Sequence, residues 1–447
     1  MEAVNTTLIR ENSSFRRLLF LVGALFLLTF YFNLASLSLI VIILSSFLLT
    51  LIFKEKIWLF LVLAAPSLVL GKILFLPITV NWVYEMSLAE AFLLIAAVVF
   101  LASRFLEGRL NEIRIDGLSA SLLLYLLLSL LSYWEIIDSR LFIFGSKVVV
   151  FSFLAYLLSS NLLTGKRLRW FLYGLGLTAF FLSLEIFYKF YAIGWSSRFF
   201  FDRSHIIVPA GPIATVAAIL TLLLPLVLAD YFSERTKAKP FILAAFVLGS
   251  LALFLTLGKA AILSLILALV YLFSKLKDKR VAFGLTAVSF VLLSYIFFSS
   301  FFNGLFERIS YVFADANTQF RFLEYRLGWE LIRDHLWFGV GTGQQLLYFN
   351  RLLNLEDSQY VNNVFLQAFI DLGLAGLLAA LLILHEIRAK LKFIFKKVRR
   401  EDLILYSGFA ASFLAAFLNG LAEVTFFALP YAIIFWSIAG AASALRE

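Results

Sequence analysis

The 447-residue chain contains no cysteine and only three histidines. Without cysteine there can be no disulfide, no thiolate nucleophile and no metal site built on sulfur ligands. His205, His335 and His385 show neither the HxxH nor the HExxH spacing, which argues against a zinc site. The sequence therefore predicts a protein that works without a cofactor.

Charged residues are also scarce. They make up 15% of the chain, while hydrophobic residues make up 62%. A soluble domain has about half apolar and about a quarter charged residues, so the composition predicts a polytopic membrane protein. Residues 1–17 are polar and basic, and no small-residue cleavage site follows the first apolar run. We expect that run to be a retained signal anchor.

Apolar runs fill most of the sequence. A membrane-spanning helix needs about 20 apolar residues, and the charge-free run 18–53 is long enough for two, with a turn near Asn33. Further runs lie at 57–76, 87–103, 117–134, 141–159, 170–193, 207–229, 240–257, 260–274, 281–300, 363–384, 403–421 and 425–444. We expect 12 to 14 transmembrane helices, because short runs such as 260–274 also fit re-entrant segments. The predicted fold class is all-α, with one transmembrane domain over residues 1–447.

One long hydrophilic stretch, residues 301–362, interrupts this pattern. If the N-terminus is cytoplasmic and the runs alternate sides, 26 of the 38 lysines and arginines lie in inside segments and only 10 lie outside. This asymmetry follows the positive-inside rule. It predicts a cytoplasmic N-terminus and C-terminus, and it places the insertion 301–362 on the outer face of the membrane. The net charge of +10 is then a topology signal, and nucleic acid is not an expected partner.

The few cations on the predicted outer side need an explanation. Arg198, Arg203 and His205 precede the entry into one span, and Lys259 lies in the short turn Leu257–Gly258–Lys259. Burying a charge without a partner costs several kcal/mol, so cations at such places are candidates for a functional site. The alternative is that each side chain reaches the headgroup phosphates of membrane lipids.

Residues 319–335 of the outer stretch have helical periodicity. Apolar residues on one face are Phe320, Leu323, Leu327 and Leu331. Another face carries Phe322, Arg326, Trp329 and Arg333. This pattern fits an amphipathic helix on the membrane surface. It also fits a helix whose arginines turn inward and hold an anion, since the guanidinium group binds phosphate oxygens through two hydrogen bonds.

A glycine cluster and an asparagine pair follow this helix. Gly339, Gly341 and Gly343 come after a helix rather than a strand, so they are a weak nucleotide-binding signal. Glycine at these positions allows a tight turn or a close backbone approach. Asn362 and Asn363 stand where the chain re-enters the membrane, and the positive end of the next helix dipole would face the same layer as the arginines.

These motifs, taken in order, resemble the C-terminal signature of the O-antigen ligases and the related O-antigen polymerases. The resemblance covers about residues 195–384 and depends on the order and spacing of several motifs. The matching segments are Arg326-Leu-Gly-Trp329, Asp334-His335-Leu-Trp-Phe-Gly339-Val-Gly341-Thr-Gly343, Asn362-Asn363-Val-Phe-Leu-Gln367 and Asp371-Leu-Gly373-Leu-Ala-Gly376. The Lys259 turn resembles the family's S-R-G segment, and the stretch 198–212 resembles its arginine-containing outer loop.

The resemblance implies a membrane glycosyltransferase that moves a glycan from undecaprenyl pyrophosphate to an acceptor on the periplasmic face. The acceptor would be lipid A–core for a ligase, or another lipid-linked glycan for a polymerase. Two departures concern the site: Asn362 stands where the family has a histidine, and Lys259 where it has an arginine. Asparagine cannot act as a general base near neutral pH, so the role of the family histidine does not transfer.

We expect a reaction without a metal, in which fixed positive charges stabilise the departing diphosphate. The predicted pyrophosphate-binding residues are Arg198, Arg203, Lys259 and Arg326. The candidates for a general base are His205, His335 and Glu324, with Asn362 as a further catalytic position. Other predicted substrate-binding residues are Arg321, Trp329, Arg333, Gly341, Gly343 and Asn363. Two rival interpretations are a transporter of lipid-linked sugars and a catalytically silent relative.

Overall fold

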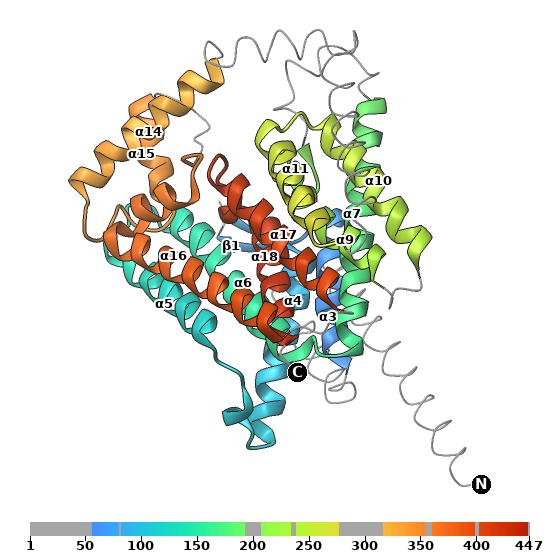
Figure 1. The fold of residues 1–447 in the computed structure, drawn as a ribbon. Helices are drawn as coiled ribbons and strands as arrows, with labels where there is room; N and C mark the ends of the chain where they lie inside the picture. The colour runs from blue at the N-terminus through green and yellow to red at the C-terminus, as the bar shows by residue number, and fades with distance from the viewer. Residues whose placement is uncertain are drawn as a thin grey trace, which may run out of the picture.

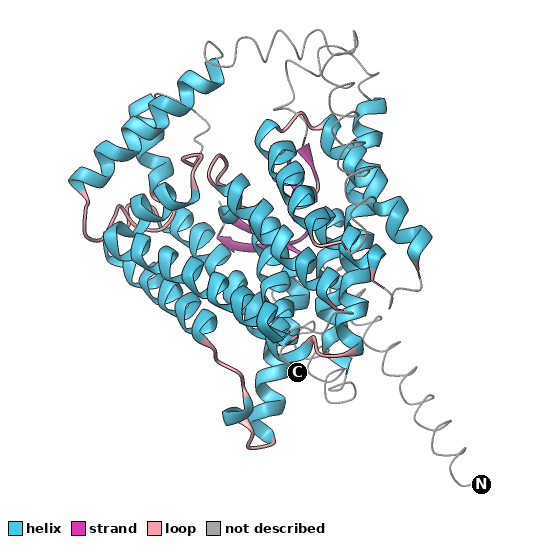
Figure 2. Ribbon diagram, in the orientation of Figure 1, coloured by secondary structure: helices cyan, strands magenta, loops and turns pink. Residues whose placement is uncertain are grey.

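The computed structural model describes residues 56–79, 82–192, 207–233, 238–276, 316–353, 360–397 and 402–445. Its described part is a helical bundle with very few strands (Figures 1 and 2). The predicted spans in 18–53 and at 281–300 lie outside the described residues, as do Arg198, Arg203 and His205.

The predicted all-α polytopic fold is confirmed. Seven described helices are long and apolar enough to cross a membrane. They are α4 (Leu88–Leu106), α5 (Gly117–Leu131, continued by η4, Ser132–Glu135), α6 (Ser139–Leu162), α7 (Lys166–Ala192), α9 (Ile213–Phe232), α16 (Val364–Lys397) and α17 (Leu403–Gly420). Four shorter apolar helices are α3 (Trp58–Ser67), α10 (Lys239–Leu255), α11 (Lys259–Ser274) and α18 (Leu429–Ala444). Every apolar run predicted within the described residues therefore contains a helix.

One predicted span is shorter than expected. The run 57–76 was expected to be helical throughout, but α3 ends at Ser67 and is followed by the 3₁₀ turn η2 (Leu68–Leu70). Gly71 then has a φ of 70°, which ends the helical path because only glycine adopts this conformation without strain. The chain continues as β1 (Lys72–Thr79), which pairs antiparallel with β2 (Trp82–Ser87). A second, two-residue ladder joins β3 (Ile207–Val208) to β4 (Gly211–Pro212).

Helix α9 forms the centre of the bundle. Almost all of its side chains are buried, and it packs against α7, α10, α11, α17 and α18. A helix that is apolar on all sides is expected in such a position. Close helix contacts depend on small residues: a Cβ built on Gly440 of α18 would lie 2.5 Å from the Tyr156 carbonyl oxygen of α6.

The polar stretch between α11 and α16 contains two described helices, α14 (Ala316–Asp334) and α15 (Gln345–Leu353). They lie at the upper end of the bundle in Figure 1, away from the connection between α4 and α5, which contains the short η3 (Leu110–Glu112). The chain ends near that connection, after η7 (Thr425–Phe427) and α18. Two segments predicted on opposite sides of the membrane, α14–α15 and the α4–α5 connection, thus lie at opposite ends of the bundle.

Candidate functional site

The predicted helix at 319–335 is present as α14, but of the predicted apolar face Leu331 is buried while Leu323 is 40% exposed. Leu331 and Ile332 are buried, whereas the Arg326 and Arg333 side chains are each 78% exposed. The buried face packs against Val361 and against Ile370 of α16. The arginines therefore point away from the protein, and no inward-facing arginine cluster forms from Arg326 and Arg333.

The glycine segment joins α14 to the membrane helices. Gly339, Gly341 and Gly343 have φ values of 70°, 94° and 76°. The amides of Val340 and Gly341 donate to the carbonyl groups of Ile370 and Asp371, each at 2.9 Å. These hydrogen bonds hold the two backbones side by side, and the positive φ values favour glycine at the three positions.

The contact between the glycine segment and the membrane helices leaves no room for side chains at the glycines. A Cβ on Gly339 would lie 2.5 Å from the Asp371 carbonyl carbon, and one on Gly343 would lie 2.5 Å from the Leu141 carbonyl oxygen. On the other side of the joint, Gly373 has a φ of 64° inside α16, and its Cβ would lie 2.4 Å from the Trp337 carbonyl carbon. The described contacts of the predicted substrate-binding residues Gly341 and Gly343 are with other helices of this chain.

Side chains next to the glycines fasten the same joint. The Thr342 hydroxyl lies 2.9 Å from the Ser129 hydroxyl and 3.1 Å from that of Ser132, both at the end of α5. The buried Gln344 accepts hydrogen bonds from the amides of Ile137 and Asp138 and donates to the Asp138 carbonyl. These hydrogen bonds fix the glycine segment to the turn between α5 and α6.

The polar residues that the structure does bring together lie between α14 and the start of α16. The Asn362 side-chain amide donates to Glu324 Oε2 at 2.9 Å, and the Tyr325 hydroxyl donates to the Asn362 carbonyl at 3.0 Å. Glu324 is fully buried, and its Oε1 has no hydrogen-bond partner among the described residues. Burial raises the pKa of Glu324, although Asn362 and Arg321 act in the opposite direction.

Arg321 lies one helical turn before Glu324. Its guanidinium group forms an ion pair with Glu423 at 2.6 Å and donates to the Ala422 carbonyl at 2.8 Å. Burial alone would lower the pKa of Arg321, but the adjacent Glu423 carboxylate raises it overall. The loop after α17 is in this way held against α14.

Asn363 has a clear structural role. Its side-chain oxygen accepts hydrogen bonds from the amides of Phe365 and Leu366, each at 3.0 Å, and so caps the first turn of α16. Its amide group donates to the Leu421 carbonyl at 3.1 Å. Asn362 and Asn363 thus differ: one contacts Glu324, and the other begins the helix.

The predicted site residues His335 and Trp329 make their described ring contacts away from Glu324. His335 follows the last residue of α14, about 16 Å further along the helix axis at 1.5 Å per residue, and its ring lies 5.9 Å from that of Tyr348. Trp329 is 63% exposed and contacts Phe369. Lys259 is the exposed first residue of α11, directly after the predicted tight turn, where Leu257 has a φ of 53°.

An apolar cavity of about 140 Å³ begins beside the first turn of α16. Its walls come from α5, α6, α16, α17, η7 and α18, and they contain no charged residue. Val364, Phe365 and Ala368 line the part that follows Asn363 directly. Further along α16, Ile383 and Ile387 line it, so the cavity extends from the polar layer towards the other end of the bundle.

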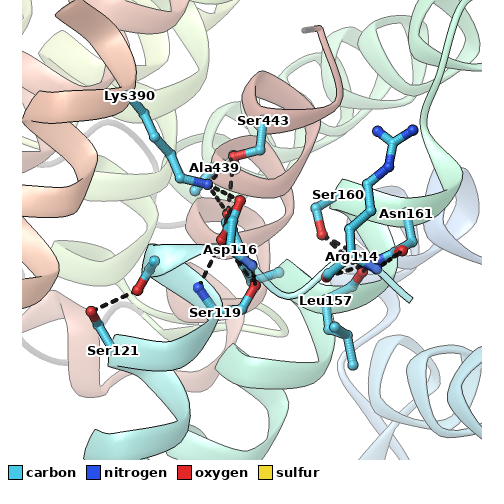
Figure 3. Close-up of polar contacts among 12 residues, drawn as sticks. Arg114, Asp116, Ser119, Ser121, Leu157, Ser160, Asn161, Lys390, Ala439 and Ser443 are labelled. Atoms are coloured by element: carbon cyan, nitrogen blue, oxygen red, sulfur yellow. Dashed lines mark hydrogen bonds and ion pairs between the residues drawn. The ribbon is translucent and has the colours of Figure 1, made fainter. Parts of the chain in front are cut away.

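A second buried polar cluster lies near the far end of α16 (Figure 3). The Lys390 ammonium group contacts Asp116 and Tyr156 and donates to the Ser443 hydroxyl at 2.8 Å. Asp116 accepts from the Tyr156 hydroxyl and caps α5. Burial raises the pKa of Asp116, but the Lys390 charge lowers it overall. Because Lys390 is paired with a carboxylate, it is poorly suited to act as a base. The cluster connects α16 to α6, to α18 and to the start of α5.

Sequence reasoning missed Glu423, Tyr325 and the Asp116–Lys390 pair. Glu423 stands in a short predicted outer loop without a cation, so counting outer carboxylates together with outer cations would have singled it out. Lys390 was counted among the residues of a cytoplasmic loop, but it belongs to α16 and is only 7% exposed. No local pattern distinguishes it from its exposed neighbour Lys392.

Comparison with known families supports the interpretation of this region. Residues 244–381 match the family model described as O-antigen ligase. The match includes α11, α14, α15 and the first half of α16, and therefore Lys259, Arg321, Glu324 and Asn362. Comparison with curated protein sequences gave no match.

Proposed function

We propose that this chain, whose residues 244–381 match the O-antigen ligase family model, is a membrane glycosyltransferase. It would transfer a glycan from undecaprenyl pyrophosphate to lipid A–core on the periplasmic face of the bacterial inner membrane. The observation that carries this proposal is the buried Glu324–Asn362 pair, which lies within the matched region beside Arg321. A buried carboxylate with a raised pKa suits a general base.

In the proposed reaction, the acceptor hydroxyl gives its proton to Glu324 Oε1. Its oxygen forms a bond to the anomeric carbon of the glycan, and the bond from that carbon to the diphosphate oxygen breaks. The diphosphate leaves with the electron pair. Because Glu324 is buried, the first turn of α16 must move away from α14 to admit the hydroxyl, and Asn362 orients the carboxylate through its hydrogen bond.

The departing diphosphate needs positive charge at the same layer. Arg321 lies one helical turn before Glu324, and its pairing with Glu423 holds it there. In the proposal, Arg321, Lys259, Arg198 and Arg203 stabilise the diphosphate. Arg326 lies on the opposite face of α14 from Glu324, so we assign it no part in this step.

The apolar cavity, of about 140 Å³, has room for the first isoprene unit of the donor's polyprenyl chain, next to the diphosphate. It is lined by apolar and aromatic side chains and starts directly after Asn363, so a chain within it would hold the diphosphate near the polar layer. Filling the cavity with Ala380→Phe should raise the KM for a full-length polyprenyl donor. A donor analogue with a methyl group in place of the lipid should be affected much less, and equal effects on both donors would contradict this placement.

The proposed activity can be tested with purified protein in detergent, undecaprenyl-pyrophosphate glycan and lipid A–core. We expect glycan-bearing lipid A–core as the product, and loss of product with Glu324→Gln, Arg321→Ala, Arg203→Ala or Lys259→Ala at normal protein levels. Lys392→Met, an exposed cation on α16, is the matched control and should keep full activity.

Two outcomes would contradict the proposed ligase, and a third would contradict the proposed diphosphate site. A polymerase would lengthen the lipid-linked glycan without lipid A–core. A transporter would leave the donor unchanged in detergent and show activity only across a sealed bilayer. Full activity of the Arg203, Lys259 and Arg321 variants together would refute the assignment of the diphosphate site.

A further inference from the structure

The outward face of α14 carries a continuous row of side chains, Phe322, Arg326, Trp329 and Arg333, which we term the α14 stripe. Their spacing of three and four residues places them on one face of the helix. Phe322 is 62% and Trp329 is 63% exposed, and both arginines are more exposed still. Large aromatic residues in such a position suggest a binding surface.

The arrangement differs from that of a helix lying on a membrane. Such a helix inserts its apolar face into lipid and keeps its basic residues on the opposite face. In α14 the apolar residues Leu331 and Ile332 are buried against the protein, where they pack with Ile370, and Leu323 is 40% exposed. The aromatic and basic residues share the remaining face, so a lipid surface is the poorer fit.

The charges of the stripe also argue against an anionic ligand. Arg326 pairs with Glu330 at 3.3 Å, and Arg333 with Asp334 at 3.5 Å. Each positive charge is thus accompanied by a negative one, and the surface has little net attraction for phosphate or for acidic headgroups. It still offers many hydrogen-bond donors and acceptors, because both guanidinium and carboxylate groups remain exposed.

Trp329 lies between these two pairs. Its ring is perpendicular to that of Phe369, with centroids 6.4 Å apart, and this contact helps to hold it in position. The face of an aromatic ring carries partial negative charge and attracts weakly positive C–H groups. The ring face of a sugar presents such C–H groups, and its rim presents hydroxyls that both guanidinium and carboxylate groups can bind.

We propose that the α14 stripe binds the glycan chain of the donor, beyond the sugar that reacts. This inference depends on the proposed function and names a second contact for the same substrate. The stripe and Glu324 lie on opposite faces of one helix, whose diameter with side chains is about 10 Å. A single sugar therefore cannot reach both, but a chain of several sugars can.

The test compares two donors on the purified enzyme, one carrying a single sugar and one carrying a long glycan. Trp329→Ala should raise the KM for the long donor about 3- to 10-fold, as expected for loss of one aromatic contact, and leave the short donor unchanged. Trp329→Phe should restore most of the loss. Trp134→Ala removes another exposed tryptophan, 84% exposed on η4, and is the matched control.

A binding measurement separates this inference from the proposed function. The probe is the source organism's surface polysaccharide, released from its lipid by mild acid, titrated against the protein in nanodiscs. Weaker binding by Trp329→Ala supports the inference even if neither donor reacts. Unchanged binding, an equal loss of activity with both donors, or a loss confined to binding of phosphatidylglycerol vesicles would overturn it.

Discussion

Glu324 shows how the surroundings of a single side chain change its chemistry. The same α14 helix carries Glu330, which is half exposed and pairs with Arg326 in water. Glu324 is fully buried, hydrogen-bonded on one oxygen to Asn362, and has a raised pKa. Because Asn362 cannot accept the proton of a hydroxyl, the proposed reaction gives this role to the carboxylate beside it.

Glu324→Gln provides the test at this scale. The base must be ionised, so wild-type kcat/KM should rise with pH along a limb that lies above the ordinary carboxyl pKa of 4.5. Gln cannot accept the proton, so activity should be lost at every pH. A pH–rate profile of both proteins measures this, and a wild-type rate without such a limb would contradict the role of Glu324 as the base.

Glu324→Gln should abolish activity without reducing the stability of the fold. The folded-state pKa is raised, so this group stabilises the fold below the unfolded pKa and loses that contribution as pH rises through the folded pKa. Gln retains an oxygen for the Asn362 hydrogen bond and carries no charge. Thermal unfolding at pH 7 should therefore show Glu324→Gln to be at least as stable as the wild type.

At the scale of elements, α16 connects the polar layer to the far end of the bundle. Its first turn is capped by Asn363, its kink at Gly373 contacts the glycine segment, and Lys390 fixes its last turns. A change at one of these points should therefore affect how α14 is held, even where it does not touch the site.

Gly339→Ala should strongly destabilise the protein. Its Cβ would meet the Asp371 backbone at 2.5 Å, in addition to the strain of a positive φ, and we expect a cost of roughly 3 kcal/mol or more. Gly108→Ala is the matched control, since Gly108 also has a positive φ, 67°, but no atom near its Cβ. It should cost only about 1 kcal/mol. Equal melting temperatures for the two variants would contradict the close contact between Gly339 and the Asp371 backbone.

The prediction for the Asp116–Lys390 cluster concerns an unpaired charge. Lys390→Met leaves Asp116 without its cation and should cost about 3–5 kcal/mol, because breaking a buried pair strands one charge. The double variant Lys390→Met/Asp116→Asn should recover much of this loss, and Lys392→Met should be neutral. Thermal unfolding in detergent measures all three, and additive losses in the double variant would disprove the coupling.

At the scale of the whole molecule, the predicted orientation follows from the distribution of lysine and arginine. The absence of cysteine makes the orientation easy to test, because any introduced cysteine is the only thiol. In intact cells with a permeabilised outer membrane, a membrane-impermeant maleimide should label Glu330→Cys, whose side chain is 47% exposed. Lys392→Cys should be labelled only after lysis. The reverse pattern would place the proposed site on the cytoplasmic side.

The sequence alone determined the fold class and most of the helices, because apolar runs of the length of a bilayer are visible without any tertiary information. The periodicity of α14 separated the exposed Arg326 and Arg333 from the buried Leu331, but it placed Leu323, which is 40% exposed, on the buried face. The sequence did not show that the run from residue 57 ends at Gly71, since that depends on a backbone conformation and on strand pairing.

The tertiary structure decided which polar residues meet. The sequence presented Arg326 and Arg333 as inward-facing candidates, but the apolar stripe of α14 is buried against α16 and turns both arginines outward. Glu423 joins Arg321 from 102 residues away, and Asp116 joins Lys390 from 274 residues away. Hydropathy identifies segments that cross a membrane, but contacts between distant segments depend on how the helices pack, and that packing made Glu324 a buried carboxylate next to Asn362.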